Sequence, residues 1–415
     1  MATPPRAPLK PLSDALAQLL ATVTPLAQTE RVATLEADGR VLAQDVVSAL
    51  HVPPQDNSSM DGYALRVQDV AQAGTVLPVS QRIAAGSAGT PLQPGTVARI
   101  FTGAPVPAGA DAIVMQEDCV AVPVAEGATP QVQVNVVAQP GQWIRRAGED
   151  VTRGAVVLAA GQRLGPAAQG LAASIGMDRL TVVRRPRVAL FSTGDELVMP
   201  GSVAPQDMPP GAIYNSNRFF LNSLLRRLGC EVTDLGIVPD QFDATVQALR
   251  DAAATHDVIL TSGGVSVGEE DHIKPAVQSL GSLDLWQIAI KPGKPFAHGK
   301  VGAAHFIGLP GNPVSSFVTF MVLVRPFLLR LQGVMVLEPL SQVARADFAW
   351  PRADKRQEFL RVRRNAQGGL DLFPNQSSGV LTSAVWGDGL VDNPGGQTIQ
   401  PGDTVRFIPF VELLA

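Results

Sequence analysis

The 415-residue chain has little of what several protein classes depend on. Only two cysteines occur, Cys119 and Cys230, which argues against a disulfide framework and fits a reducing compartment. The five histidines show no spacing typical of zinc ligands, so we expect no structural zinc. Lys and Arg number 33 against 37 Asp and Glu, and the net charge is −4. The basic field of a nucleic-acid-binding protein is therefore missing, and we expect no nucleic acid partner.

Long uninterrupted hydrophobic runs are also missing. Arg6 and Lys10 precede an apolar stretch, but polar residues interrupt it and its leucines recur at helical spacing, which predicts an amphipathic helix rather than a signal peptide. The most apolar later run, residues 317–329, contains Arg325 and Pro326, which argues against a membrane span. We expect a cytoplasmic protein with no membrane segment.

Charged residues make up 17% of the chain, below the roughly 25% usual in soluble domains, which predicts extensive buried surface that includes a subunit interface. Glycine and proline are abundant, at 39 and 34 residues, and this predicts many tight turns and short strands. The length allows three or four domains.

The predicted fold class is α/β and β multidomain. Residues 1–55 together with 141–184 are expected to form an elongated mixed α/β domain, and residues 56–140 a β-rich inserted domain. Residues 185–332 are expected to form a central, doubly wound, mostly parallel α/β domain. Residues 333–415 are expected to form a small C-terminal β-barrel, with a sandwich as the alternative.

The central domain is predicted from alternating strands and helices. Val188–Ser192 is a continuous apolar run, as expected for a strand covered on both faces. Leu221, Leu224, Leu225 and Leu228 mark one face of a helix, and Gly229 ends it. Further strands are predicted near Val232 and over Val258–Thr261, Leu285–Ile290 and His305–Leu309, and a long helix over about Asn312–Leu331.

Five loops of this domain are rich in glycine, proline, hydroxyl and charged residues. In order they read STGDE (192–196), PD (239–240), SGGVSVGEED (262–271), KPGKP (291–295) and PGNPVSS (310–316). Each follows a predicted strand, and ligands of parallel sheets bind outside the carboxyl ends of the strands. Any one of these loops is more often a simple turn, but five at one sheet edge predict a ligand site.

The residue types in these loops suit a phosphorylated ligand and a metal ion. Glycines let backbone N–H groups approach phosphate oxygens, and Lys291 and Lys294 could neutralise an oxyanion. The carboxylates are the ligands that Mg²⁺ prefers. The candidates are Asp195, Glu196, Asp240 and Asp271.

The first half of the chain holds a second set of polar segments. These are DNSSMDGYA (56–64), RIFTGAP (99–105) and RRAGED (145–150). Taken singly each is a turn or a cap, and composition does not place them near the loops of the central domain.

Together these segments resemble, in order, the motifs of the molybdopterin molybdenumtransferase family, the MoeA-like family that includes the E domain of gephyrin. The motifs are DNSSMDGYA, RIFTGAPVPAGADAIVMQED, GED, STGDEL, IYNSN, SGGVSVGEED, IKPGKPFA and GLPGNPVSS. The resemblance runs from about residue 10 to the C-terminus and is weakest after residue 335.

The resemblance implies a cytoplasmic enzyme that inserts molybdate into adenylylated molybdopterin, with Mg²⁺-assisted release of AMP, to give molybdenum cofactor. It also implies an elongated homodimer whose site is shared between the central domain of one subunit and the β-rich domain of the other. The upstream adenylyltransferase and molybdoenzyme chaperones are further expected partners.

The resemblance also assigns roles to residues of this sequence. The expected catalytic residues are Asp61, Thr102, Asp150, Glu196, Asp240 and Asp271, of which Glu196, Asp240 and Asp271 are expected to hold the metal. The expected substrate-binding residues are Ser262, Gly263, Gly264, Ser266, Lys291, Lys294, Pro310, Pro313, Arg356 and Ser377.

Two other functions remain open. A molybdopterin adenylyltransferase has a related α/β domain, but the resemblance to it is confined to residues 186–332. A non-catalytic scaffold of the gephyrin type is the second alternative, and the acidic and lysine positions argue against it.

Overall fold

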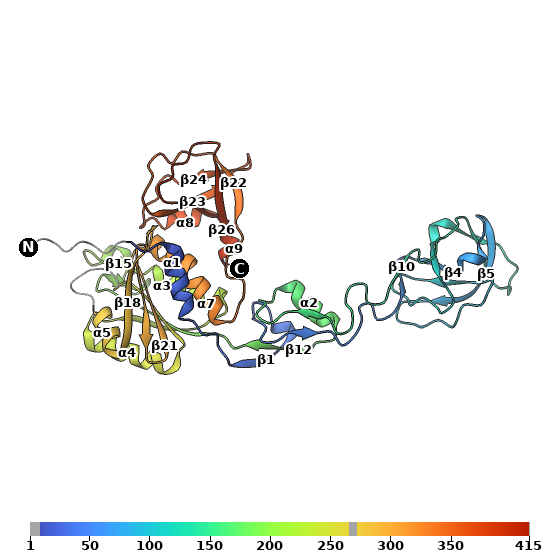
Figure 1. Ribbon diagram of the computed structural model, residues 1–415, viewed down its shortest axis with the longest axis horizontal. Helices are drawn as coiled ribbons and strands as arrows, with labels where there is room; N and C mark the ends of the chain where they lie inside the picture. The colour runs from blue at the N-terminus through green and yellow to red at the C-terminus, as the bar shows by residue number, and fades with distance from the viewer. Residues whose placement is uncertain (1–8, 265–271, 415) are drawn as a thin grey trace, which may run out of the picture.

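The structure is a computed structural model that describes residues 9–264 and 272–414. Figure 1 shows an elongated molecule, with an α/β domain (residues 187–331, with residues 12–21) and a barrel (residues 342–414) at one end. A middle module (residues 29–48 and 151–183) follows, and an outer module (residues 57–145) lies at the other end. The chain passes through the middle module twice, on its way to the outer module and back.

The α/β domain is built on a six-stranded sheet in the order β16-β13-β17-β21-β20-β18. The four parallel strands are β13 (Arg187–Thr193), β16 (Glu231–Val238), β17 (Val258–Ser262) and β21 (Ala304–Leu309). Strands β20 (Pro295–Val301) and β18 (Gly281–Gln287) continue the sheet with antiparallel pairings. Every residue of β17 and β21 is buried, as expected for strands covered on both faces.

Helices cover both faces of this sheet. On one face α1 (Leu12–Ala21), α3 (Asn217–Arg227), α6 (Pro313–Thr319) and α7 (Arg325–Leu331) pack on Leu190 and Leu260. On the other face α4 (Phe242–Thr255) and α5 (Ile273–Leu280) pack on Phe191 and Ile259. Successive residues along each strand point to opposite faces of the sheet and so pack into two separate cores.

The run Pro313–Leu331 is a single helical rod, with one π-helical turn over Phe320–Val324 between α6 and α7. Its length and hydropathy would suffice to cross a membrane, but 83% of it is buried inside the protein. It is the core helix of the α/β domain.

The prediction of this domain is wrong at the Pro-rich segment. The strand expected over Leu285–Ile290 is displaced, since β18 ends at Gln287 and a separate short strand, β19, covers Ile290–Lys291. Strand β20 was not predicted, because His298, Gly299 and Lys300 interrupt its apolar pattern and Pro295 suggests a turn. Because β20 is antiparallel to both of its neighbours, β18 and β21, these two strands run parallel to each other.

The middle module pairs segments that are far apart in the sequence. Strand β1 (Thr29–Ala33) pairs with β12 (Arg179–Val183), and β2 (Val46–Val47) with β11 (Val156–Leu158). Helix α2 (Pro166–Ser174) packs on them through a small core that includes Leu42 and Leu180.

The outer module is a six-stranded sheet in the order β7-β4-β6-β5-β9-β8. The strands are β4 (Gly62–Leu65), β5 (Thr75–Ile83), β6 (Val97–Ile100), β7 (Ala112–Met115), β8 (Cys119–Val122) and β9 (Gln131–Val134). Where the module joins the rest of the chain, β3 (Asn57–Ser58) pairs with β10 (Ile144–Arg145).

The C-terminal segment forms a closed five-stranded barrel, since its pairings run β22-β26-β25-β23-β24 and return to β22. Its strands are β22 (Gln342–Ala346), β23 (Gln357–Arg364), β24 (Gly369–Leu372), β25 (Gly389–Asn393) and β26 (Thr404–Pro409), with helices α8 (Thr382–Trp386) and α9 (Phe410–Leu414). Strand β19 pairs with β23, which fixes the barrel to the α/β domain. The predicted multidomain fold class, with a mostly parallel central sheet and a C-terminal barrel, is confirmed.

Candidate active site

A cavity of about 750 Å³ lies at the carboxyl ends of the parallel strands in the α/β domain. All five loops singled out in the sequence contribute to it, because β18 runs parallel to β21 and its loop reaches the same edge. Its lining includes Thr193, Gly194, Glu196, Asp240, Ser262, Gly263, Gly264, Pro295, Pro310 and Pro313. The short strands β14 (Leu197–Val198) and β15 (Ile213–Tyr214) form one wall.

The turn after β17 requires glycine for a steric reason. Gly263 has a φ of 94° and Gly264 a φ of 67°, both in the left-handed region. A Cβ atom on Gly263 would also lie 3.0 Å from the carbonyl oxygen of Thr193, at the end of the neighbouring strand. The two strand ends can therefore approach each other, and the Gly263 N–H donates to the Leu309 carbonyl at 3.1 Å.

A buried asparagine joins two of these loops. The side-chain amide of Asn217, at the start of α3, donates to Ser262 Oγ and to the Gly311 carbonyl, each at 2.7 Å. Asn215 also lines the cavity and is 2% exposed, and its Nδ2 has no hydrogen-bond partner in the described part of the chain. One amide thus fixes the loops, and the other leaves a donor available at the cavity.

Glu196 and Asp240 place two carboxylates on the cavity wall. Neither makes an ion pair within residues 9–264 and 272–414, so both are available to a cation. In that same part of the chain no three acidic, histidine or cysteine side chains gather as a metal-binding group. The third predicted metal ligand, Asp271, and the predicted anion contact Ser266 lie outside the described residues.

Lys291 faces the barrel. Its Nζ lies 3.0 Å from Glu358 Oε1 and 3.4 Å from Asp354 Oδ2, and 5.7 Å from the centre of the Trp350 ring. Asp354 in turn accepts two hydrogen bonds from the Arg356 guanidinium, at 2.9 and 2.7 Å, and these hold the pKa of Asp354 well below its usual range. Two cations predicted to bind substrate, Lys291 and Arg356, therefore meet at one carboxylate.

The other predicted substrate contacts lie around this edge. Pro310 and Pro313 line the cavity. Ser377 precedes Ser378, whose carbonyl accepts from the Val314 backbone N–H of α6, and so lies in the barrel loop nearest the cavity. Lys294 is in the loop between β19 and β20 and has no ion pair to any described residue.

Asp61, Thr102 and Asp150 lie far from this cavity, at the junction of the outer module (Figure 1). Asp61 Oδ1 accepts from the Thr102 backbone N–H at 2.8 Å and from its hydroxyl at 2.7 Å. These bonds, the backbone one foremost, lower the pKa of Asp61. Asp150 lines a separate hollow of about 400 Å³ with Asn57 and Arg145.

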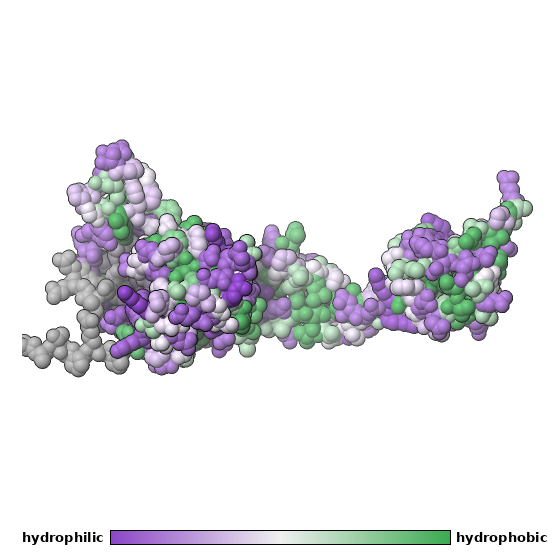
Figure 2. Space-filling view, turned by 90° about the horizontal axis from the view of Figure 1, so that it is seen from above, coloured by the Kyte–Doolittle hydropathy of each residue, from purple (hydrophilic) through white to green (hydrophobic). Residues whose placement is uncertain are grey.

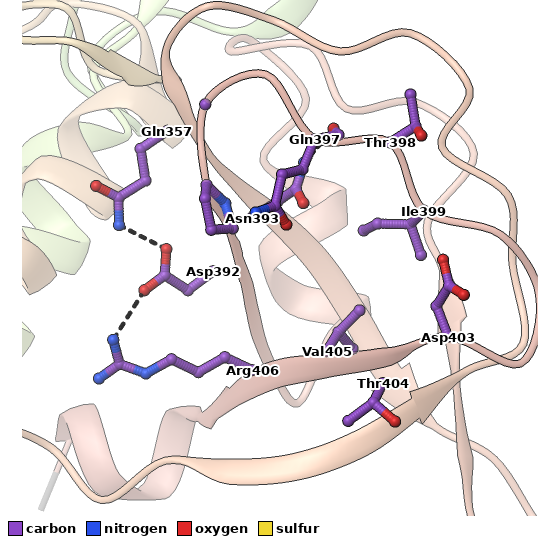
Figure 3. A pocket seen from close by; sticks show the side chains of 12 residues that line it. Gln357, Asp392, Asn393, Gln397, Thr398, Ile399, Asp403, Thr404, Val405 and Arg406 are labelled. Atoms are coloured by element: carbon purple, nitrogen blue, oxygen red, sulfur yellow. Dashed lines mark hydrogen bonds and ion pairs between the residues drawn. The ribbon is translucent and has the colours of Figure 1, made fainter.

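The barrel has a hollow of its own, of about 630 Å³, lined only by residues 357 and 392–406. Figure 3 shows that Asp392 points toward Gln357 on one side and Arg406 on the other. Its carboxylate accepts from Gln357 at 2.5 Å and from Arg406 at 3.1 Å. Asp392 is thus a buried carboxylate with a cationic partner, away from the cavity of the α/β domain.

Neither cysteine is suited to nucleophilic catalysis. Burial raises the pKa of Cys230 to about 12 and that of Cys119 to about 11, so both thiols stay protonated near neutral pH. The described lining of the cavity offers carboxylates, amides, hydroxyls and backbone groups.

The structure thus brings Glu196, Asp240, Ser262, Gly263, Gly264, Pro310 and Pro313 to one cavity. Lys291 and Arg356 do not line it but meet at Asp354, where the barrel contacts the α/β domain, and Ser377 lies two residues before Gly379, which lines it. Asp61, Thr102 and Asp150 lie apart within one chain, and the roles of all these residues remain predictions. Sequence reasoning did not single out Asn215, Asn217 or Glu358. The motif IYNSN held a signal for the two asparagines, since polar residues at a helix start beside a strand edge are frequent ligand contacts.

Comparisons with known proteins cover most of the chain. Residues 10–176 match the MoeA N-terminal region (domain I and II), residues 189–330 a family described as "Probable molybdopterin binding domain", and residues 343–410 the MoeA C-terminal region (domain IV). The molybdopterin molybdenumtransferase of Haemophilus influenzae is 38% identical over 414 residues, 97% of this chain and 99% of that protein. That of Synechococcus elongatus is 39% identical over 402 residues, 93% and 95% of the two chains. The crystal structure of the molybdopterin biosynthesis moeA protein from Pyrococcus horikoshii superposes with a TM-score of 0.84 at 28% identity, covering 97% of this chain and all of that one.

Proposed function

The chain belongs to the molybdopterin molybdenumtransferase (MoeA) family, and we propose that it inserts molybdenum from molybdate into adenylylated molybdopterin. AMP is released and molybdenum cofactor is the product. The observation that carries the proposal is the cavity at the carboxyl edge of the α/β sheet, to which all five polar loops contribute.

The cavity has the groups that cleavage of a phosphoanhydride needs. Such cleavage depends on positioning and charge neutralisation more than on a strong nucleophile. Gly263 and Gly264 line the cavity without side chains, so a phosphate oxygen can approach the backbone there, and Asn215 Nδ2 is a donor that no described residue satisfies. Asn217 keeps the loops on both sides in register.

The carboxylates Glu196 and Asp240 fit a hard cation, because both are on the cavity wall and unpaired within the described chain. We infer that they hold Mg²⁺, with Asp271 as the predicted third ligand. When bound there, Mg²⁺ would neutralise the charge that develops on the leaving AMP phosphate.

Lys291 and Arg356 are proposed to bind the molybdate oxyanion beside the cavity. Both are held by Asp354, and each keeps N–H donors that this carboxylate does not use. Ser377 lies in the adjacent loop and would add a hydroxyl. Lys294 and Ser266 are proposed to contact the pterin phosphate or the oxyanion.

The active protein is proposed to be a homodimer in which Asp61, Thr102 and Asp150 of one subunit complete the cavity of the other. Within one chain these residues lie at the far end of an elongated molecule (Figure 1). Hydrophobic surface is exposed on the middle module (Figure 2), including Leu35 at 91% exposed. Light scattering at micromolar concentration should give twice the chain mass, and a monomer would refute the shared site.

The upstream adenylyltransferase and molybdoenzyme chaperones are proposed as transient partners, since they supply the substrate and take the product, in the cytoplasm. Titration with the purified adenylyltransferase should reveal saturable binding, and cell fractionation should recover the protein with cytoplasmic markers.

AMP release separates this function from its rivals. Purified protein given adenylylated molybdopterin and Mg²⁺ should release AMP only when molybdate is added. Consumption of ATP without molybdate would favour an adenylyltransferase, although the outer, middle and barrel modules argue against it. No turnover under either condition would favour a scaffold.

A further inference from the structure

Glu358 is a buried carboxylate at the contact between the barrel and the α/β domain. It lies on β23 directly opposite Lys291 in the β19–β23 pairing, and its side chain is 1% exposed. Oε1 accepts from Lys291 Nζ at 3.0 Å. Oε2 accepts from Trp350 Nε1 at 2.7 Å and from Asn393 Nδ2 at 3.4 Å.

The geometry of this carboxylate is fixed from inside the barrel. An ionised carboxylate out of water is costly unless it is hydrogen-bonded and paired, and here three donors and one positive charge satisfy it. Trp350 and Asn393 both donate to Oε2, and Lys291 is the one donor to Oε1 within residues 9–264 and 272–414. Glu358 therefore defines where the Lys291 ammonium lies.

Lys291 retains donor capacity in this arrangement. Glu358 takes one of its three N–H groups and Asp354 lies within reach of a second, while the side chain is 39% exposed. A flexible lysine loses side-chain entropy when it binds a ligand, and a lysine already held in place loses less. Held in this way, Lys291 can direct its remaining N–H to an anion at the contact between the barrel and the α/β domain.

We propose that Glu358 is a positioning residue, which holds the Lys291 ammonium so that it binds the molybdate oxyanion. This inference rests on the proposed function. It also makes the barrel part of the active site, because Glu358 reaches Lys291 across the pairing of β19 with β23.

Glu358→Gln tests the proposal with little change in volume. The amide oxygen can still accept from Trp350 and Asn393, but its NH₂ group would then face the Lys291 ammonium, donor against donor. The molybdate concentration that gives half-maximal rate should rise about tenfold. This is the usual loss when a hydrogen bond to a charged group is removed, here the bond that holds the Lys291 ammonium in place. The kcat at saturating molybdate should stay within about twofold, as expected when ground-state binding alone is weakened.

Asp392→Asn is the matched control. It also removes the charge of a buried barrel carboxylate with a cationic partner, one residue before Asn393, but this carboxylate bonds to Gln357 and Arg406 and not to Lys291 (Figure 3). It should leave molybdate half-saturation unchanged. An equal rise in both variants would mean a general loss of barrel stability and would overturn the positioning role.

A Lys291→Met background shows whether Glu358 acts through the lysine. There, adding Glu358→Gln should cause no further rise in half-saturation, since the group to be positioned is gone. An additional tenfold rise in the double variant would refute the proposal. So would a fall in half-saturation for Glu358→Gln alone, because it would mean that the carboxylate competes with molybdate for Lys291.

Equilibrium dialysis with molybdate alone separates this inference from the proposed function. If wild-type protein binds molybdate about tenfold more tightly than Glu358→Gln yet releases no AMP, the enzyme assignment fails and the positioning role stands. If AMP is released but the two proteins bind molybdate equally, the positioning role fails. Should Glu358→Gln not fold, Trp350→Phe removes one donor from the same carboxylate and should raise the dissociation constant about threefold.

Discussion

Replacing Asn217 by alanine should uncouple two loops of the cavity without disturbing the helix that carries it. Asn217 is the first residue of α3 and its side chain is 8% exposed. Its amide bridges the loop after β17 and the loop after β21, through Ser262 Oγ and the Gly311 carbonyl, and so adds to the direct bonds from Gly263 N–H to the Leu309 carbonyl and from Ser262 Oγ to the Pro310 carbonyl. Alanine suits the helix at least as well as asparagine, so the change acts through these two bonds.

The two lost bonds differ in cost. Ser262 is 4% exposed and its oxygen would lose its donor inside the protein, whereas Gly311 is exposed and its carbonyl can take up water. A buried acceptor left without a partner costs about 1–3 kcal/mol, and a bond exchanged for water costs little. The free energy of unfolding should therefore fall by about 1–3 kcal/mol.

The kcat/KM of the variant should fall by more than its loss of folding stability explains. Both loops carry proposed substrate contacts, and small misplacements of positioning groups cost on the order of tenfold to a hundredfold in rate. Urea unfolding and AMP release should be measured on the same preparations, with Asn222→Ala as control, since Asn222 lies on the same helix and, among the described residues, its side chain bonds only to exposed Arg226. A variant with kcat/KM within about twofold of wild type would refute the view that Asn217 organises the cavity.

Three further outcomes are expected. Burial lowers the pKa of His298 to about 4 and of His305 to about 3, so below pH 6.5 the unfolded chain binds more protons than the folded protein. The free energy of unfolding should therefore be highest above that pH and fall by up to about 2.7 kcal/mol per pH unit between pH 6 and 5. A free energy of unfolding by urea that does not change with pH would contradict this. Thr102→Val removes the hydroxyl bond that helps to lower the pKa of Asp61, so the acidic limb of the pH–rate profile should move to higher pH, whereas Thr102→Ser should match wild type. Chelation of Mg²⁺ should stop AMP release, and Glu196→Gln should require about tenfold more Mg²⁺ for half-maximal rate; an unchanged requirement would remove this residue from the metal site.

The central sheet could be predicted because its strands bury both faces. Val188–Ser192 and Val258–Thr261 are continuous apolar runs, and both are strands of the observed sheet. Strand β20 could not, because His298 and Gly299 are tolerated only through burial against Phe327 and close pairing with β18. In the barrel, β22 reads QVARA, with polar residues that face solvent and no clear alternation.

The loops of the cavity could be predicted for a similar reason. A parallel sheet brings the segments after its strands to one edge, so sequence order alone groups them. The pairing of Lys291 with Glu358 has no such signal, since the two residues are 67 positions apart and belong to different domains. The separation of Asp61 and Thr102 from the cavity likewise depends on how the modules are arranged along the chain.

The most direct test of the account is complementation between two inactive variants. Asp61→Asn damages the outer-module half of the proposed site and Asp240→Asn the α/β half. If two subunits share each site, random mixing makes half of the dimers hybrid, and one of the two sites in each hybrid has both halves intact, so about a quarter of wild-type AMP release should return. The released AMP should depend on molybdate. Absence of recovery, after mass measurement shows that hybrids have formed, would contradict a site shared between two copies of this chain.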